Sequence, residues 1–153
     1  MRTLYLAHSF QLFDIVRKWQ IMMEGMFNIK LINPFYNNEC ENIDELKNIH
    51  TKTALTRYLN SLTTEQCFCI MENDLELIRK SDGVVAYFDN PTIGTCQEII
   101  MAGYVYRIPV YIITKKYTNH PWLISIALKS GGQIFKNRTE FKKFAKDEFG
   151  EKI

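Results

Sequence analysis

Short apolar runs alternate with longer stretches of helical periodicity along the whole chain of 153 residues. The short runs predict five strands, at residues 3–7, 29–32, 83–88, 109–114 and 133–135. Apolar positions at helical spacing predict helices at about 12–27, 45–61, 64–80, 95–106, 122–129 and 139–149. Because strands alternate with helices, the pattern favours an α/β fold with a parallel sheet covered on both faces.

Two local features complete this reading. The polar segment from Asn37 to Asp44 predicts a mobile loop that could act as a lid. Thr139 is expected to cap the last helix, ahead of the first-turn acid Glu140. No internal repeat, low-complexity tract or linker interrupts the chain, so we expect one domain over residues 1–153.

The predicted topology brings two loops together. In a doubly wound sheet of this size the common strand order is 2-1-3-4-5, and ligands bind beyond the carboxyl ends of strands one and three, where the winding reverses. The loop after the first strand supplies His8, Ser9 and Phe10, and the loop after the third supplies residues 90–95. We therefore expect a single cleft between these loops.

Glu98 is the strongest candidate for chemistry in that cleft. It is the only charged residue between Asp89 and Arg107, and it follows a glycine-containing turn in a predicted helix that is otherwise apolar. With the helix expected to begin near Thr95, Glu98 falls in its first turn, beside backbone N–H groups that can bind anions. A buried acid at this position predicts a reaction centre. The alternative is that Glu98 only stabilises the amino terminus of its helix electrostatically.

Asp74 is a second acid in an unusual position. It lies four residues after Ile70 and four before Ile78, on the apolar stripe of its predicted helix, whereas Glu72 and Glu76 share the wet face with Arg79. It could be paired with a buried tyrosine or arginine. Alternatively, two inward carboxylates are what glycosidic bond cleavage needs, about 5 Å apart if one of them is a nucleophile.

Composition restricts the partners. A net charge of +2 and a pI near 8.3 fall short of the basic bias of a dedicated nucleic-acid-binding protein, so small anionic ligands are favoured over polymers. The amino-terminal apolar run is too short for a signal peptide, and no segment approaches the roughly 18 apolar residues of a membrane span. We expect a cytoplasmic protein with no membrane partner.

Cysteine and histidine spacing gives no support to a metal site. The four cysteines are Cys40, Cys67, Cys69 and Cys96, and none forms a CxxC pair. On a helix the thiols of Cys67 and Cys69 would point about 200° apart, so we expect reduced structural thiols. The three histidines are scattered, and we predict no metal and no cofactor.

Three segments together resemble one enzyme family. They are LYLAHSF at residues 4–10, NDLELI at 73–78 before SDGVVA at 81–86, and PTIGT at 91–95 leading to Glu98 and Ala102. In these segments the chain resembles the nucleoside 2-deoxyribosyltransferases and the related 2'-deoxynucleoside 5'-monophosphate N-hydrolases, over about residues 4–135. The resemblance implies a three-layer, flavodoxin-like (Rossmann-like) fold and a homo-oligomer whose neighbouring subunit completes the site.

The resemblance also implies roles for individual residues. Glu98 matches the glutamate that attacks C1' of the deoxyribose, and Asp74 matches the aspartate that contacts the sugar or the departing base. Tyr5 matches the tyrosine that orients the nucleophile, and Phe10 lies where an aromatic covers the base. For Tyr5 and Phe10, an ordinary packing role is equally consistent with the sequence.

The chain departs from many transferases at Thr92, where they carry an acid. The monophosphate hydrolases have a serine there, and Ser125 likewise resembles the serine that reaches a phosphate across their subunit interface. With Gly94 and Thr95 at the predicted helix start, these hydroxyls could cradle a monophosphate, although Gly94 and Thr95 alone are a weak phosphate signal. Ser125 could equally be a helix-surface hydroxyl.

Four functions stay open at this point. The first is transfer of deoxyribose from a nucleoside or its monophosphate to an acceptor nucleobase. The second is hydrolysis of a 2'-deoxynucleoside 5'-monophosphate, with water as the acceptor. The third is a non-catalytic nucleotide-binding or sensor domain, and a fourth, hydrolysis of NAD-like dinucleotides, would need a larger cleft. No residue decides between purine and pyrimidine bases.

Overall fold

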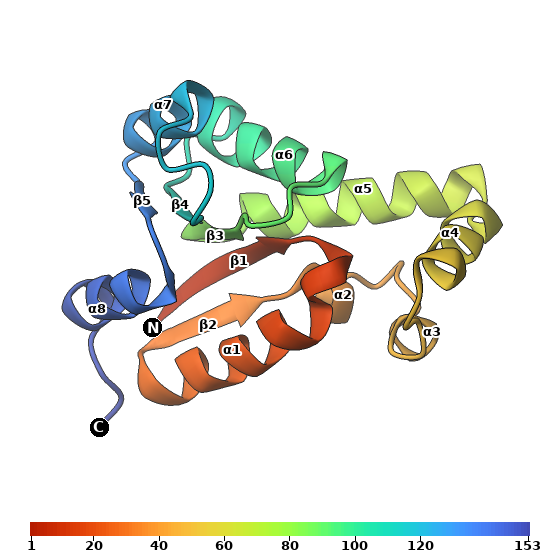
Figure 1. Cartoon of the computed structure of the whole chain (residues 1–153), viewed down its shortest axis with the longest axis horizontal. Coiled ribbons are helices and arrows are strands. Elements are labelled where there is room, and N and C mark those ends of the chain that lie inside the picture. Colours follow the sequence, from red (N-terminus) through yellow and green to blue (C-terminus); the bar gives the residue numbers. More distant parts are fainter.

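The computed structural model describes all residues from Met1 to Ile153. Its centre is a five-stranded parallel sheet in the order β2-β1-β3-β4-β5, as the sequence predicted (Figure 1). The strands are β1 (Arg2–His8), β2 (Ile29–Ile32), β3 (Gly83–Tyr87), β4 (Val110–Ile113) and β5 (Gln133–Phe135). The larger helices are α1 (Phe13–Met26), α4 (Lys52–Ser61), α5 (Thr64–Arg79), α6 (Ile93–Ile100), α7 (Pro121–Lys129) and α8 (Arg138–Phe149). No helix is both long and apolar enough to cross a membrane.

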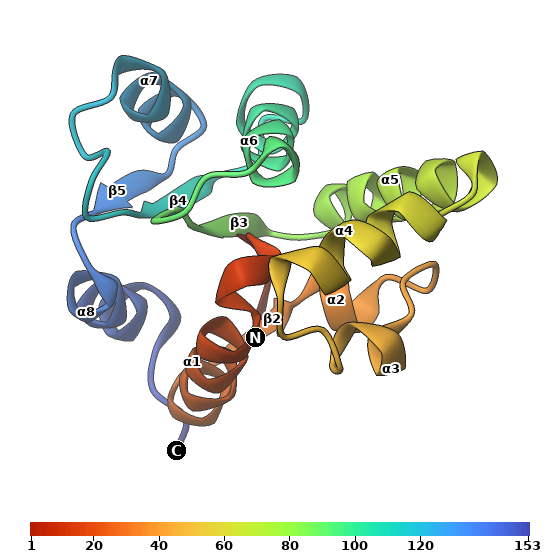
Figure 2. The ribbon, with the colours of Figure 1, turned by 45° about the vertical axis from the view of Figure 1, so that its right-hand side comes forward.

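The alternation of side chains along β1 separates two cores. Leu4 and Leu6 point to one face of the sheet, where α1 and α8 cover them, and Tyr5 and Ala7 point to the other, where α5, α6 and α7 lie (Figures 1 and 2). All four side chains are at most 1% exposed. The flavodoxin-like, three-layer arrangement is therefore confirmed, and Tyr5 lies on the same face as α5 and α6.

Three predicted element boundaries were wrong. The expected helix at 45–61 is a short turn, α3 (Ile43–Leu46), followed by α4, because Thr51 starts α4 with its own side-chain cap. The helix expected to begin near residue 95 begins at Ile93, capped by Thr92, and after α6 it continues as a π-helix, η2 (Met101–Val105). The last helix is capped by Asn137 rather than Thr139.

The segment expected to be a mobile loop is instead held at several points. Its first residue, Asn37, ends the short helix α2 (Pro34–Asn37), and the segment runs into α3. Between them Cys40 forms a disulfide with Cys69 of α5, with a Cα–Cα distance of 5.8 Å. The expectation of four reduced thiols was therefore wrong for this pair, because the fold brings together cysteines 29 positions apart in the sequence. Cys67 and Cys96 are free.

Gly132 is expected to tolerate no side chain. It lies between α7 and β5, and a Cβ there would overlap the backbone of Val110 in β4. We expect Gly132→Ala to lower the free energy of unfolding by roughly 3 kcal/mol, because the backbone cannot give way as a flexible side chain would. Gly25→Ala in α1 is the matched control, since its Cβ would meet nothing within 4 Å. That change should raise the free energy of unfolding by up to about 1 kcal/mol in urea denaturation.

Candidate active site

A hydrogen bond between β1 and α6 forms the centre of the candidate site. The Tyr5 hydroxyl donates to Oε1 of Glu98 over 2.7 Å, and the two residues are 93 positions apart in the sequence. Tyr5 is 0% exposed and Glu98 is half-buried. The strand alternation that sends Tyr5 to the α6 side of the sheet therefore fixes one oxygen of the Glu98 carboxyl.

The sequence predicted that Glu98 lies in the first turn of its helix, and this prediction was wrong. Because α6 begins at Ile93, Glu98 is in the second turn, and the first turn contains no acid. Burial raises the pKa of Glu98 to about 8, with a smaller upward contribution from the charge of Asp74 and a downward one from the Tyr5 hydrogen bond. The carboxyl is thus poised near neutral pH rather than held as a capping anion.

Asp74 of α5 lies beside the same pair. Its Oδ1 accepts a 2.8 Å hydrogen bond from Nδ2 of Asn38, and its charge raises the pKa values of both Tyr5 and Glu98. Burial raises the pKa of Asp74 to about 6, the Asn38 hydrogen bond lowers it, and the charge of Glu41 raises it. On the wet face of α5, by contrast, Glu76 pairs with Arg79 and Lys80.

These pKa values determine which groups of the site are protonated at neutral pH. Between about pH 6 and pH 8 the two carboxyls together hold one proton, and the higher pKa of Glu98 keeps that proton mostly on Glu98 while Asp74 is ionised. Burial, followed by the charges of Glu98 and Asp74, keeps Tyr5 protonated by raising its pKa well above 10. The arrangement can therefore supply one carboxylate and one carboxylic acid at neutral pH.

A third acid near the site was missed by the sequence analysis. Glu41 accepts a 2.6 Å hydrogen bond from the Tyr58 hydroxyl of α4, and burial raises its pKa. Nothing in the sequence marked Glu41, since it lies in a polar segment beside other acids. Asn38, which is 4% exposed and bonds to Asp74, was missed for the same reason.

The loop after β1 forms an aromatic and polar wall. His8 is buried, with Nε2 3.2 Å from Oδ1 of Asn33 and Nδ1 3.0 Å from the Ser9 carbonyl, and burial lowers its pKa. Phe10 is half-buried against Phe35, another residue that the sequence did not mark, at a centroid distance of 5.6 Å. Oγ of Ser9 is buried without a hydrogen-bond partner, so it has capacity for a ligand.

The start of α6 supplies the remaining predicted hydroxyls. Oγ1 of Thr92 accepts from the Thr95 N–H over 3.4 Å and lies 3.1 Å from Oγ1 of Thr95. Gly94 is exposed with open space where a Cβ would be, so it leaves the backbone accessible. The two threonines thus lie together at an open helix terminus.

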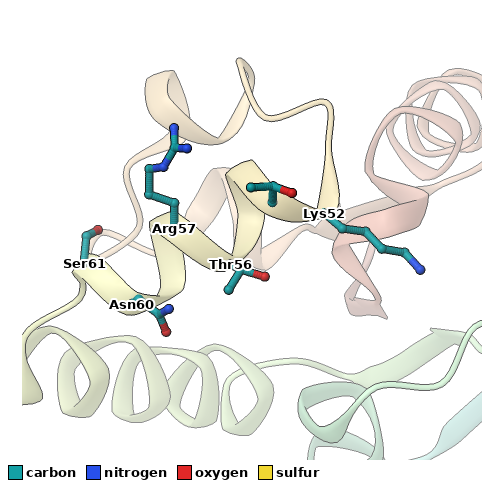
Figure 3. Close-up of a pocket in the computed structure, with 6 residues that line it drawn as sticks. Lys52, Thr56, Arg57, Asn60 and Ser61 are labelled. Atoms are coloured by element: carbon teal, nitrogen blue, oxygen red, sulfur yellow. The ribbon is translucent and has the colours of Figure 1, made fainter.

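Ser125 is not joined to this cluster within one chain. It is exposed on α7 and lines a groove of about 560 Å³ with Gly103, Tyr104 and Trp122. A larger hollow of about 660 Å³ follows α4, where Lys52, Thr53, Thr56, Arg57, Asn60 and Ser61 line it (Figure 3). All six are exposed and none belongs to the Tyr5–Glu98–Asp74 cluster, so volume alone does not locate the chemistry.

Two solved structures share this fold. A 2-deoxyribosyltransferase from Bacillus psychrosaccharolyticus matches with a TM-score of 0.62 and 15% sequence identity, covering 99% of each chain. A CMP N-glycosidase from Clostridium botulinum matches with a TM-score of 0.55 and 15% identity, covering 94% of this chain and 96% of the other. The sequence matches no protein-family model and no curated protein. At this identity the similarity confirms the flavodoxin-like fold that the sequence resemblance implied.

The raised pKa of Glu98 predicts a pH-dependent gain in stability when its charge is removed. Because the folded pKa lies above the unfolded value of 4.5, the folded state binds the proton more tightly, and stability falls as the pH rises from about 4.5 through about 8. Glu98→Gln cannot ionise and keeps an acceptor for Tyr5. We expect the free energy of unfolding of the variant to exceed that of the parent by roughly 2 to 4 kcal/mol at pH 8.

At pH 4.5 the same comparison should give little difference, as measured by urea denaturation across the pH range. Glu72→Gln on the exposed face of α5 is the control, and it should show no such trend. A parent and Glu98→Gln pair with equal stabilities at pH 8 would contradict a raised pKa at Glu98.

Proposed function

We propose that this protein cleaves the N-glycosidic bond of 2'-deoxyribonucleosides or their 5'-monophosphates and transfers the deoxyribose to an acceptor nucleobase. The observation that carries the proposal is the Tyr5–Glu98 hydrogen bond with Asp74 beside both residues. Two carboxyls of different pKa from different elements match the requirement for one nucleophile and one proton donor. The fold shared with a 2-deoxyribosyltransferase and a CMP N-glycosidase adds support.

Glu98 is the nucleophile in this mechanism. Its carboxylate attacks C1' of the deoxyribose, and the bond from C1' to the base nitrogen breaks with its electron pair going to the base. The Tyr5 hydroxyl holds one carboxylate oxygen, which leaves the other for C1'. The product of this step is a covalent deoxyribosyl ester of Glu98.

Asp74 manages the proton. The reaction needs Glu98 ionised and the proton on Asp74, which is the less populated singly protonated form because the pKa of Asp74, about 6, lies below that of Glu98. In that form Asp74 protonates the leaving base, and as a carboxylate it accepts a proton from the incoming base that resolves the ester. The two carboxyls and Tyr5 supply the groups that these steps need, and Phe10 covers the base. On this proposal the enzyme needs no cofactor and serves nucleotide salvage in the cytoplasm.

Hydrolysis of a 5'-monophosphate is the second candidate, and the start of α6 favours it. Thr92 presents an exposed hydroxyl next to the accessible backbone at Gly94, with the buried Thr95 hydroxyl 3.1 Å behind it, and this suits a phosphate better than an acid at position 92 would. Ser125 would reach that phosphate from a second copy of the chain. Exposed apolar side chains around Ser125, with Trp122 68% and Tyr104 65% exposed, support such a homo-oligomer.

A non-catalytic nucleotide-binding domain is the third candidate, and the electrostatics disfavour it. Two half-buried carboxyls with raised pKa values lower the stability of the folded state at neutral pH. A domain that only binds nucleotides would gain stability by replacing one of them with an amide.

Glu98→Ala should abolish release of the base while the fold remains, because the nucleophile is lost but α6 keeps its cap and its apolar contacts. We expect a fall in kcat of at least about 1000-fold for every substrate. Deoxynucleosides and deoxynucleoside monophosphates are incubated with enzyme, with and without an acceptor base, and the products are resolved by chromatography. New nucleoside formation identifies transfer, and free deoxyribose or its 5-phosphate identifies hydrolysis.

Glu72→Ala is the matched control, since Glu72 is an exposed acid of α5 outside the cluster. It should retain the parent activity with each substrate. Full turnover by purified Glu98→Ala would reject the covalent mechanism.

A substrate with an activated leaving group separates the roles of the two acids. A 2-deoxyriboside of a nitrophenol needs no protonation to leave, so Asp74→Asn should keep most of the parent rate for the first burst of nitrophenolate release while losing roughly 100-fold in base release from a natural nucleoside. Glu98→Ala should fail with both. Equal losses on the two substrates in Asp74→Asn would contradict a proton-transfer role for Asp74.

The pH dependence of kcat/KM on the natural substrate should also separate the roles of Glu98 and Asp74. The parent should give a bell with apparent pKa values near 6 and 8, the values of the two carboxyls. In Asp74→Asn the residual activity should only rise with pH, because Glu98 alone then titrates. Its midpoint should lie below 8, since the repulsion from Asp74 is gone.

A further inference from the structure

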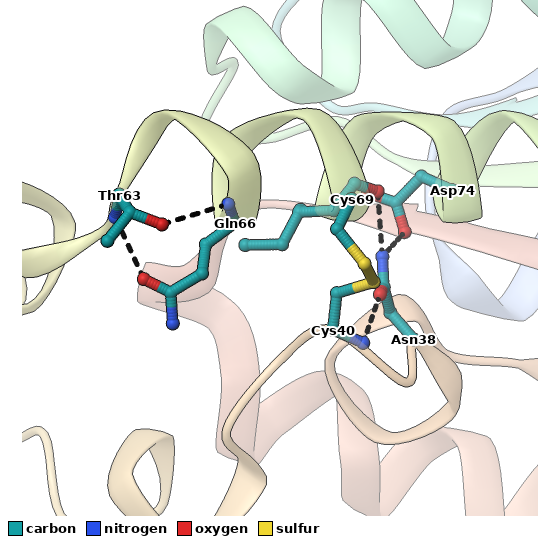
Figure 4. Close-up of a disulfide and its surroundings, with 7 residues drawn as sticks. Asn38, Cys40, Thr63, Gln66, Cys69 and Asp74 are labelled. Carbon is teal, nitrogen blue, oxygen red and sulfur yellow. Dashed lines mark hydrogen bonds between the residues drawn. A yellow bond between two sulfur atoms is a disulfide. The ribbon is translucent and has the colours of Figure 1, made fainter.

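The side chain of Asn38 connects Asp74 to the backbone of α5 and to the backbone of its own segment. Its Nδ2 donates to Oδ1 of Asp74 and to the carbonyl of Ile70, each over 2.8 Å, and its Oδ1 accepts from the Cys40 N–H over 2.9 Å (Figure 4). Asn38 is 4% exposed, and its amide donates two hydrogen bonds and accepts one, so it is shielded from solvent and held on both sides. The side chain is therefore a fixed bridge between the segment 38–42 and α5.

The Cys40–Cys69 disulfide joins the 38–42 segment to α5 covalently, next to the Asn38 hydrogen bonds. Cys40 is two residues after Asn38, and its partner Cys69 immediately precedes Ile70, whose carbonyl Asn38 contacts. Figure 4 shows the sulfur–sulfur bond and the Asn38–Asp74 hydrogen bond next to each other, at the junction of the 38–42 segment with α5. The segment has one further anchor, the Glu41–Tyr58 hydrogen bond to α4.

We propose that Asn38, held in place by the Cys40–Cys69 disulfide, is a positioning residue for Asp74, and that opening the disulfide impairs proton transfer without unfolding the protein. The inference rests on the proposed function of Asp74. It assigns a role to a segment that the sequence marked only as a loop, and it makes the activity sensitive to thiol redox state.

The charges around Asp74 give the physical reason. Tyr5 from β1, Glu98 from α6 and Glu41 from the 38–42 segment all face it, and none of them is a cation. Asn38 is thus the stronger of two neutral donors, with Tyr5 the weaker, that stabilise the Asp74 carboxylate against burial and the charge of Glu41. Without the Asn38 donor the pKa of Asp74 rises, and the side chain is free to turn away from the base.

Reduction gives a defined chemical step. A dithiol such as dithiothreitol transfers two electrons and two protons to the disulfide, which yields the thiols of Cys40 and Cys69 and the cyclic disulfide of the reagent. The segment then keeps its hydrogen bonds but loses its covalent link to α5. Cys67 and Cys96, which are free, take no part in this step.

The test compares two ways of disturbing the bridge. Asn38→Asp keeps an acceptor for Cys40 but loses the donor to Asp74, and the Cys40→Ser/Cys69→Ser double variant removes the disulfide. Each should lower kcat on a natural nucleoside roughly tenfold, the loss expected for one hydrogen bond to a charged group. KM should change little, and the lower limb of the pH profile should move to higher pH in Asn38→Asp.

The activated deoxyriboside separates a positioning role from a purely structural one. If Asn38 and the disulfide only supported the fold, the variants would lose activity on this substrate as well. Both variants should release the first equivalent of nitrophenolate at the parent rate, because this step needs no proton from Asp74. Dithiothreitol should reproduce the defect of the double variant in the parent and in the control Cys67→Ser, and it should leave the double variant unchanged. Mass measurement after alkylation, with and without reductant, counts the cysteines in the bond.

The outcomes separate this inference from the proposed function. Absence of base release by the parent would refute the proposed function itself. With an active parent, the inference is overturned if Asn38→Asp keeps the parent rate and pH profile, or if alkylation finds Cys40 and Cys69 free in the air-oxidised protein. If the double variant fails to fold, as judged by circular dichroism, Asn38→Asp and the reductant series still decide.

Discussion

A hydrogen bond from a fully buried tyrosine to a half-buried carboxyl is the interaction on which the site depends. Tyr5 lies in β1, an inner strand of the sheet, and is fully buried, so its side chain has little freedom, and it holds Glu98 through a 2.7 Å hydrogen bond. Because the bond offsets only part of the cost of burial, the pKa of Glu98 remains high. A rigid, weakly acidic carboxyl next to a second acid suits attack on an electrophilic carbon.

The topology explains why these groups meet. Parallel strands order their carboxyl ends along one edge, and β1 and β3 lie at the centre, where the winding reverses. Helices α5 and α6 precede and follow β3, and both pack on the face of the sheet that Tyr5 shares. Asp74 and Glu98 therefore approach the same hydroxyl from two sides, although neither is near Tyr5 in the sequence.

The segment between β2 and α5 adds a second layer of control. Asn38, the Cys40–Cys69 disulfide and the Glu41–Tyr58 pair attach it to α5 and α4, so a stretch that reads as a polar loop is a structured wall beside Asp74. The groove around Ser125 lies elsewhere, on α7 and η2, so Ser125 does not join the Tyr5–Glu98–Asp74 cluster within one chain.

The sequence by itself determined the alternation of strands and helices and the candidacy of Glu98 and Asp74, because strand and helix periodicity are local and an isolated acid on an apolar stripe is visible in one dimension. The sheet order was expected from the common topology of such folds, and Tyr5 from the family resemblance. Tertiary structure decided the rest. The start of α6 depended on the Thr92 cap, which moved Glu98 away from the helix terminus. Asn38, Glu41 and the disulfide were invisible because their partners lie 17 to 36 residues away, and only packing determines which distant side chains meet.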